Sequence, residues 1–206
     1  MLRTPSNRHG QMTDAYKTIS GTSEGTYSEL RSKFLAFAHP VTTVEEAMAV
    51  VERYQKKFYD ARHVCWAYML GPEREVFRSN DNGEPSGTAG KPILGQINSF
   101  GLTDVVVMVV RYFGGVKLGT SGLIVAYRTA AAEALSNASI VVRTVDEDYT
   151  FSFEYPFMTA VMKVVREMDA RIVSQTYDMD CSMTVSLRKG KMDELKEKVR
   201  KALSPF

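Results

Sequence analysis

Residues 111–127, RYFGGVKLGTSGLIVAY, combine the residue types from which proteins build anion-binding turns. The stretch follows an apolar, strand-like run and leads into a helix predicted from about 120 to 136. Backbone N–H groups at the start of a helix are unpaired and carry the positive end of the helix dipole, so they attract anions. The residues predicted to form this site are Gly114, Gly115, Gly119, Thr120, Ser121 and Gly122.

The spacing of these glycines differs from that of a nucleoside-triphosphate P-loop. Gly114 and Gly119 have the separation of the G-x-x-x-x-G-K-[ST] motif, but Thr120 stands where that motif requires lysine. The alternative is a structural turn in which the glycines only let a strand reverse into a helix, with Thr120 or Ser121 as its N-cap. Spacing alone favours the structural turn.

Charge around the same stretch favours an anion as its ligand. No acidic residue occurs between 105 and 132, whereas the basic residues there are Arg111, Lys117 and Arg128. Three aromatic residues are of the type that stacks on nucleic-acid bases: Trp66, and the adjacent Tyr112 and Phe113. We expect Trp66 and Phe113 to belong to the core and only Tyr112 to be a surface candidate.

A second loop, NDNGEPSGTAG at 80–90, contains a further candidate site. Asp81 and Glu84 have the chemistry of a metal-binding or acid–base pair, although turn formation explains this composition better. The residues assigned to this candidate site are Asp81, Glu84, Ser86, Gly87, Thr88 and Lys91. His63 and Cys65 lie two residues apart on one strand, but no third residue that would orient the histidine is evident, so we predict neither a catalytic residue nor a metal site.

Bulk composition predicts a globular protein, the order of its expected elements is of the α+β class, and no motif calls for a cofactor. The 206 residues are 44% hydrophobic and 24% charged, with a formal net charge of +2. The two cysteines, Cys65 and Cys181, are far apart, which indicates a reducing, cytoplasmic compartment. The longest apolar run, 105–110, is too short to cross a bilayer. Residues 1–13 are predicted to be a disordered leader.

Hydrophobic periodicity divides the remaining chain into two domains, 14–145 and 146–206. In the first, we expect strands at 15–19, 32–41, 63–70, 75–79 and 104–110, and helices after Thr43, from Pro92 and from about 120. The second reads strand, helix, strand, strand, helix, which is a ferredoxin-like order without an obvious fourth strand. The boundary is placed at the composition change in VRTVDEDY, near residue 146.

Two long motifs in this order resemble the YigZ/IMPACT family: DNGEPSGTAGKPIL at 81–94 and VVVMVVRYFGGVKLGTSGLIVAY at 105–127. RSKFLAFAHPV and DARHVCWAY, upstream, fit the same pattern, and the resemblance covers roughly 16–136. It implies a first domain similar to domain IV of elongation factor G, of the ribosomal-protein-like β-α-β class. The second domain would be ferredoxin-like, similar to domain V. Asn82 stands where the family usually has aspartate, and Ser121 where it has glycine.

The resemblance leaves two functional hypotheses. Eukaryotic relatives regulate translation by blocking activation of a starvation-responsive kinase, with help from an added domain, so that role is not expected here. The first hypothesis is a non-enzymatic, translation-associated protein that binds RNA or ribosomal components through the basic glycine-rich loop. The second is a small-molecule hydrolase or phosphotransfer enzyme that uses the 80–90 loop beside the helix start. We favour binding because the sequence contains neither an activated nucleophile pair nor metal-ligand spacing.

Overall fold

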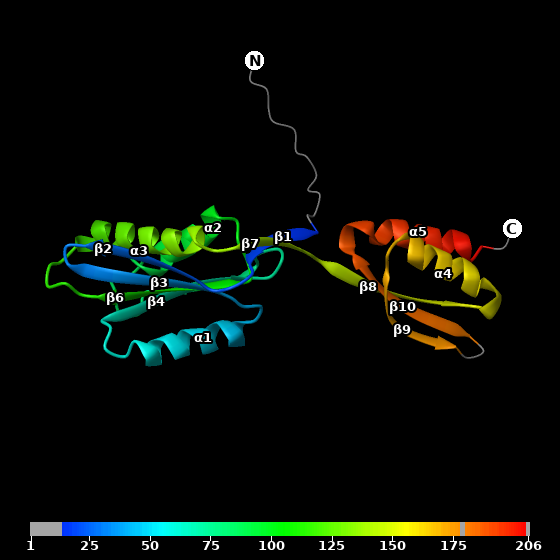
Figure 1. The fold of residues 1–206 in the computed structure, drawn as a ribbon, viewed down its shortest axis with the longest axis horizontal. Coiled ribbons are helices and arrows are strands. Elements are labelled where there is room, and N and C mark those ends of the chain that lie inside the picture. The colour runs from blue at the N-terminus through cyan, green and yellow to red at the C-terminus, as the bar shows by residue number, and fades with distance from the viewer. Residues whose placement is uncertain (1–13, 178–179, 205–206) are drawn as a thin grey trace, which may run out of the picture. The chain divides into compact units, whose positions relative to one another are not determined.

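The computed structural model describes residues 14–177 and 180–204 and has a mixed α+β architecture (Figure 1). The chain divides into two compact units, one of residues 16–143 and one that joins the residues up to 15 to residues 144–206. The predicted boundary segment is not a loop, because β7 (Ile140–Thr144) and β8 (Asp146–Phe153) follow each other with Val145 alone between them.

A five-stranded sheet forms the centre of the 16–143 unit, in the order β2-β3-β6-β4-β5. Its strands are β2 (Ser23–Glu29), β3 (Ser32–Pro40), β4 (His63–Leu70), β5 (Val76–Asn80) and β6 (Val105–Tyr112). All neighbouring pairs are antiparallel. A separate two-stranded sheet pairs β1 (Ala15–Ile19) with β7.

Helices cover both faces of the five-stranded sheet, with α1 (Val44–Lys57) on one face and α2 (Gly90–Ser99) and α3 (Gly119–Ser136) on the other (Figure 1). β6 is buried between the two layers, which explains its continuous apolar sequence. Val105, Val107 and Val109 pack in the core with α2 and α3, whereas the alternate residues Val106, Met108 and Val110 pack with α1. This alternation fixes which side of the sheet each β6 side chain faces.

The helix starts agree with the sequence only in part. Thr43 is the N-cap of α1 and its side chain accepts a hydrogen bond from the Glu46 N–H over 3.1 Å. α2 begins at Gly90, two residues before Pro92, which the sequence analysis placed first. The prediction that Thr120 or Ser121 caps α3 was wrong, because Leu118 occupies the N-cap position and no side chain caps that helix.

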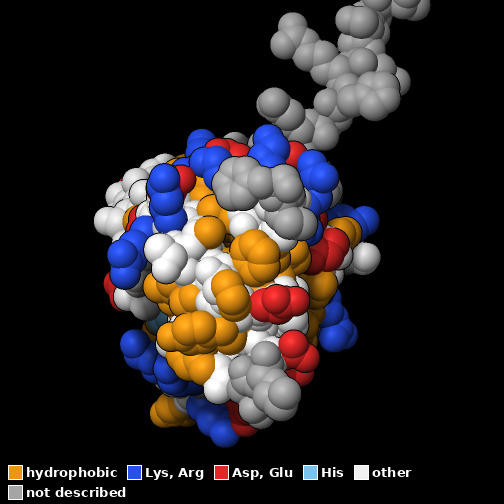
Figure 2. Space-filling model, turned by 90° about the vertical axis from the view of Figure 1, so that its right-hand side faces the viewer, with side chains coloured by type: hydrophobic (Ala, Val, Ile, Leu, Met, Phe, Trp, Pro, Cys, Tyr) orange, Lys and Arg blue, Asp and Glu red, His pale blue; other side chains and the backbone are white. Residues whose placement is uncertain are grey.

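The other unit contains a three-stranded antiparallel sheet in the order β8-β10-β9, with β9 at Arg171–Tyr177 and β10 at Cys181–Arg188. Helices α4 (Met158–Glu167) and α5 (Met192–Ala202) share one apolar core with its inward-facing residues. Asp14 belongs to this unit: its carboxylate accepts hydrogen bonds from Arg188 Nε over 2.6 Å and from the Gly190 N–H over 2.9 Å. Figure 2 shows a face of this unit on which hydrophobic side chains gather, with charged side chains around them.

Candidate anion-binding pocket

The loop between β6 and α3 requires glycine for backbone reasons. Gly115 and Gly119 have φ values of +87° and +73°, a region that other residues rarely adopt. At Gly114 a Cβ atom would overlap the backbone of Arg31 in the β2–β3 turn. These glycines are therefore required by the backbone of the turn. This structural role is compatible with a binding site, because the turn also positions the start of α3.

A pocket of about 620 Å³ opens beside the start of α3. Pockets of this size fall within the range of about 300–1,000 Å³ typical of small-molecule sites. The lining comes from four segments of the chain and comprises Arg62, His63, Glu84, Pro85, Arg111, Phe113, Lys117, Leu118, Gly119, Thr120 and Leu123. Arg62 and Lys117 are exposed, so both cations are available to a ligand.

Glu84 is the centre of a buried polar network at this pocket. Its Oε1 accepts hydrogen bonds from Arg111 Nη1 over 2.6 Å and from the Tyr127 hydroxyl over 2.8 Å. Only 7% of the Arg111 side chain and 3% of the Glu84 side chain are exposed. The Arg111 Nε has no hydrogen-bond partner within 14–177 and 180–204, although it is buried. Arg111 is thus an ion-paired residue of the pocket lining rather than a free cation.

His63 lies beside the same carboxylate, and the backbone carbonyl of Asn82 is the orienting group that the sequence did not reveal. The ring Nδ1 lies 2.7 Å from the Asn82 carbonyl oxygen and the Nε2 lies 3.8 Å from Glu84 Oε2. Because a carbonyl oxygen only accepts hydrogen bonds, Nδ1 carries a proton, and in the neutral ring Nε2 is the unprotonated nitrogen. The relationship spans 21 residues of sequence, so local spacing gave no signal for it.

Cys65 takes no part in the pocket lining. Its Sγ lies 2.9 Å from the Asp81 carbonyl oxygen and 3.4 Å from the Tyr127 hydroxyl. Burial, the largest effect, raises the pKa of the Cys65 thiol. Burial likewise raises the pKa of the Tyr127 hydroxyl, and the neighbouring Cys65 and Glu84 raise it further. Both groups are therefore neutral, and Cys65 is a fully buried core residue.

Asp81 stabilises the start of α2. Its carboxylate accepts hydrogen bonds from the N–H groups of Gly87, Ala89 and Gly90 over 2.8, 3.0 and 2.8 Å. Burial raises the pKa of this carboxyl, but the three backbone hydrogen bonds outweigh burial and the net pKa is lowered. This interaction also explains why α2 begins before Pro92: Asp81, nine positions before Gly90, accepts hydrogen bonds from the N–H groups of the N-cap Ala89 and of Gly90 itself.

The second loop as a whole is thus mainly structural. The Thr88 hydroxyl donates to the Pro85 carbonyl over 2.6 Å, and Gly87 has a φ of +78°. Ser86 and Lys91 are exposed and outside the pocket lining. Of the six loop residues singled out in the sequence, only Glu84 lines the pocket.

The residues singled out around α3 fall into three groups. Arg111, Lys117, Gly119 and Thr120 line the pocket, whereas Gly114, Gly115 and the exposed Arg128 do not. Tyr112 is partly exposed and lies outside the pocket lining: it packs against the α1-side core and donates its hydroxyl to Asp60 Oδ1 over 2.9 Å. Pocket residues absent from the sequence-based set are Arg62, His63, Pro85, Phe113, Leu118 and Leu123.

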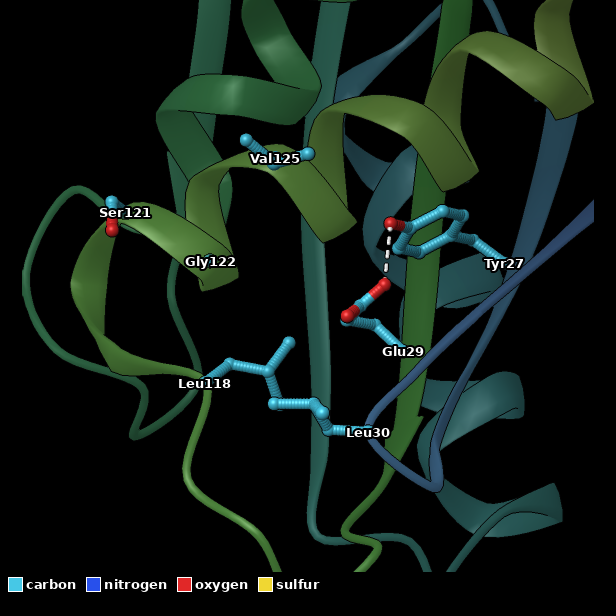
Figure 3. Close-up of a pocket in the computed structure, with 7 residues that line it drawn as sticks. All are labelled: Tyr27, Glu29, Leu30, Leu118, Ser121, Gly122 and Val125. Atoms are coloured by element: carbon cyan, nitrogen blue, oxygen red, sulfur yellow. Dashed lines mark hydrogen bonds between the residues drawn. The ribbon is translucent and has the colours of Figure 1, made fainter.

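Ser121 and Gly122 line a second, separate pocket of about 350 Å³ (Figure 3). Tyr27 and Glu29 on β2 form its polar part, with a hydrogen bond of 3.1 Å from the Tyr27 hydroxyl to the Glu29 carboxylate. Leu118 lines both pockets. The glycine-rich stretch therefore divides between two surfaces, and the carboxylate of Glu29 makes the second one less suited to an anion.

Comparison with known proteins identifies the family. The Impact N-terminal domain family matches residues 30–135, which span β3 to α3 and contain the whole pocket. The chain belongs to the IMPACT family. It is 33% identical over 171 residues to IMPACT family member YigZ of Escherichia coli, covering 82% of this chain and 84% of that protein. It is 34% identical to IMPACT family member YvyE of Bacillus subtilis over 76% of this chain and 72% of that protein.

A solved structure extends the similarity beyond the matched domain. The crystal structure of a hypothetical protein, 30% identical, covers 92% of this chain and 93% of its own, with a TM-score of 0.70. Within the described residues of this IMPACT family member, no cluster of three or more His, Cys, Asp and Glu side chains is arranged to hold a metal ion. None of the described helices combines the length and apolar character needed to span a membrane.

Proposed function

We propose that this IMPACT family member is a non-enzymatic, translation-associated protein that binds RNA or a ribosomal component through the pocket at the start of α3. The observation that carries the proposal is the convergence of exposed Arg62 and Lys117 with the uncapped first turn of α3. Unpaired N–H groups at a helix start and two cations favour a phosphate group. Similarity of the two units to domains IV and V of elongation factor G, the second ferredoxin-like, is part of the same proposal.

A buried arginine gives independent support for an anion. Arg111 is 6% exposed, lines the pocket, and has an Nε without a partner among the described residues. Buried N–H donors are nearly always satisfied in folded proteins, so this unpartnered donor favours a polar partner, such as a bound water, next to the Arg111 guanidinium. The Glu84 carboxylate compensates the charge of Arg111, and the net positive charge of the pocket comes from Arg62 and Lys117.

Two observations favour binding over the hydrolase or phosphotransfer alternative. The Asp81 carboxylate is engaged by three backbone N–H groups, and the Glu84 carboxylate is engaged by Arg111 and Tyr127. The nearest thiol, that of Cys65, is fully buried and protonated. Neither carboxylate is placed as a free acid–base group, which supports a pocket that recognises rather than transforms its ligand.

The salt dependence of RNA binding tests this proposal. Each phosphate contact that a cation makes releases counterions, so removing one cation lowers the slope of log K against log salt by about one unit or less. We expect the double variant Arg62→Ala/Lys117→Ala to weaken binding of a ribosomal RNA fragment and to flatten this slope. The matched control is Arg128→Ala, which removes an exposed cation of α3 outside the pocket. An unchanged slope in the folded double variant would leave the loop a structural turn.

A further inference from the structure

Phe113 is an exposed aromatic residue at the pocket. The residue is 49% exposed and lines the pocket together with Lys117, Gly119 and Thr120. Phenylalanine side chains are mostly buried in folded proteins. A half-exposed ring in a pocket lining therefore indicates a surface for an apolar or aromatic ligand group. Trp66, in contrast, is 4% exposed and part of the α1-side core.

The ring of Phe113 is held in place by the buried network. The guanidinium carbon of Arg111 lies 5.6 Å from the centroid of the Phe113 ring and 5.6 Å from that of Phe34. Arg111 is in turn fixed by its hydrogen bond to Glu84. An aromatic ring that is already positioned loses little conformational entropy when a ligand binds, so it contributes more to affinity than a free side chain.

We infer that the pocket binds one unpaired nucleotide of a single-stranded RNA, with its phosphate at the start of α3 and its base stacked on Phe113. The inference rests on the proposed function and names the class of its ligand. An anion-binding helix start and an aromatic ring in one pocket of about 620 Å³ match the two chemical parts of a nucleotide. The helix start does not stand alone, because the exposed cations Arg62 and Lys117 and the half-exposed ring of Phe113 line the same pocket.

Base stacking also decides between single-stranded and double-stranded RNA. In a duplex the faces of the bases are covered by their neighbours, whereas unpaired bases can be splayed out and stack on aromatic side chains. A free nucleotide carries the same base and phosphate, but a strand adds phosphates that exposed Arg62 and Lys117 can both contact.

Fluorescence anisotropy with a labelled single-stranded RNA octamer tests the inference on the full chain. Loss of one stacked base corresponds to a weakening of about 5- to 100-fold. We expect this loss for Phe113→Leu with the salt slope unchanged, near-native affinity for Phe113→Tyr, and no effect of the matched control Phe77→Leu. Phe77 is 59% exposed and outside the pocket lining. Equal affinities of folded Phe113→Leu and the native protein would overturn the inference.

The RNA itself provides a second measurement that needs no variant. We expect an octamer with abasic sites, and the same octamer in a duplex, each to bind the native protein at least about 5-fold more weakly. If the abasic octamer or the duplex binds as tightly as the single-stranded octamer, the stacking contact is overturned. If a nucleoside monophosphate binds as tightly as the octamer, the ligand is a free nucleotide and the inference of an RNA strand is overturned. Salt-dependent RNA binding that changes neither with Phe113→Leu nor with removal of the bases contradicts this inference but leaves the proposed function standing. Absence of any salt-dependent binding contradicts the proposed function.

Discussion

Arg111 Nη1 donates a hydrogen bond to Glu84 Oε1 over 2.6 Å, and both side chains are almost completely buried. The pair joins the end of β6 to the 80–90 loop, which are 27 residues apart in the sequence. Two buried opposite charges compensate each other, whereas either one alone would remain buried without a partner. The pair therefore fixes the pocket lining, and the exposed cations Arg62 and Lys117 remain for the ligand.

Replacing Glu84 tests the structural role of this pair. We expect Glu84→Gln to lower the free energy of unfolding by about 3–5 kcal/mol, because it leaves the Arg111 charge uncompensated in the interior. Urea denaturation followed by fluorescence of Trp66 measures this directly, since Trp66 is the only tryptophan and is buried in the same unit. The matched control, Glu52→Gln, removes a solvent-exposed ion pair with Lys56 and should leave the free energy of unfolding nearly unchanged. Similar small losses in both variants would contradict the prediction.

The Asp81 carboxylate gives the protein a defined stability change at low pH. Because its pKa is lowered by folding, it stabilises the native state above the unfolded-state pKa of about 3.9, and that contribution disappears as the pH falls through the folded pKa. We expect Asp81→Asn to cost about 1–2 kcal/mol at neutral pH, as loss of a helix cap does. The difference from the native protein should shrink below about pH 4.

Denaturant unfolding at several pH values measures this difference. The control is Glu73→Gln in the exposed turn after β4, which should change stability by less than about 0.5 kcal/mol at any pH. A cost of Asp81→Asn that stays constant down to pH 2 would show that the carboxylate charge is not what stabilises the start of α2.

The pocket unit is expected to fold without the residues that follow it. A fragment of 14–145 keeps both β1 and β7, which pair with each other, and the complete five-stranded sheet. We expect native-like Trp66 fluorescence and a cooperative unfolding transition for this fragment. A shorter fragment of 20–139 is the control: it lacks Ile19, a fully buried core residue, and should be less stable. An unfolded 14–145 fragment would contradict the proposed domain boundary.

Local sequence predicted most regular elements of the fold, since strand alternation and helix periodicity record which side of each element is buried, but it missed the strands β2 and β7. Relationships between distant residues were not predictable in this way. The Asp81 carboxylate reaches the N–H groups of Ala89 and Gly90 across a loop, so α2 starts where no local capping residue indicates it. Likewise, His63 meets Glu84 only because the loop folds back over the start of β4.

Strand alternation is a signal in the sequence that distinguishes Phe113, which lines the pocket, from Tyr112, which does not. Alternate residues of a strand face opposite sides, so Arg111 lies on the side of Val109, while Tyr112 lies on the side of Val110 and packs with α1. Continuing the alternation places Phe113 with Arg111, on the side of the pocket. Applying the two-residue period past the end of the apolar run would have selected the exposed ring.

Chemical-shift mapping with a single-stranded RNA octamer at low salt tests the central claim most directly. If the start of α3 holds a phosphate, the backbone amide signals of Gly119 and Thr120 should shift as RNA is added, together with that of Lys117. The amides of Arg128, further along α3, and of Thr184 on β10 should serve as unshifted references. Shifts confined to the 144–206 unit, or no shift at Gly119 and Thr120 under conditions where RNA binds, would contradict the account.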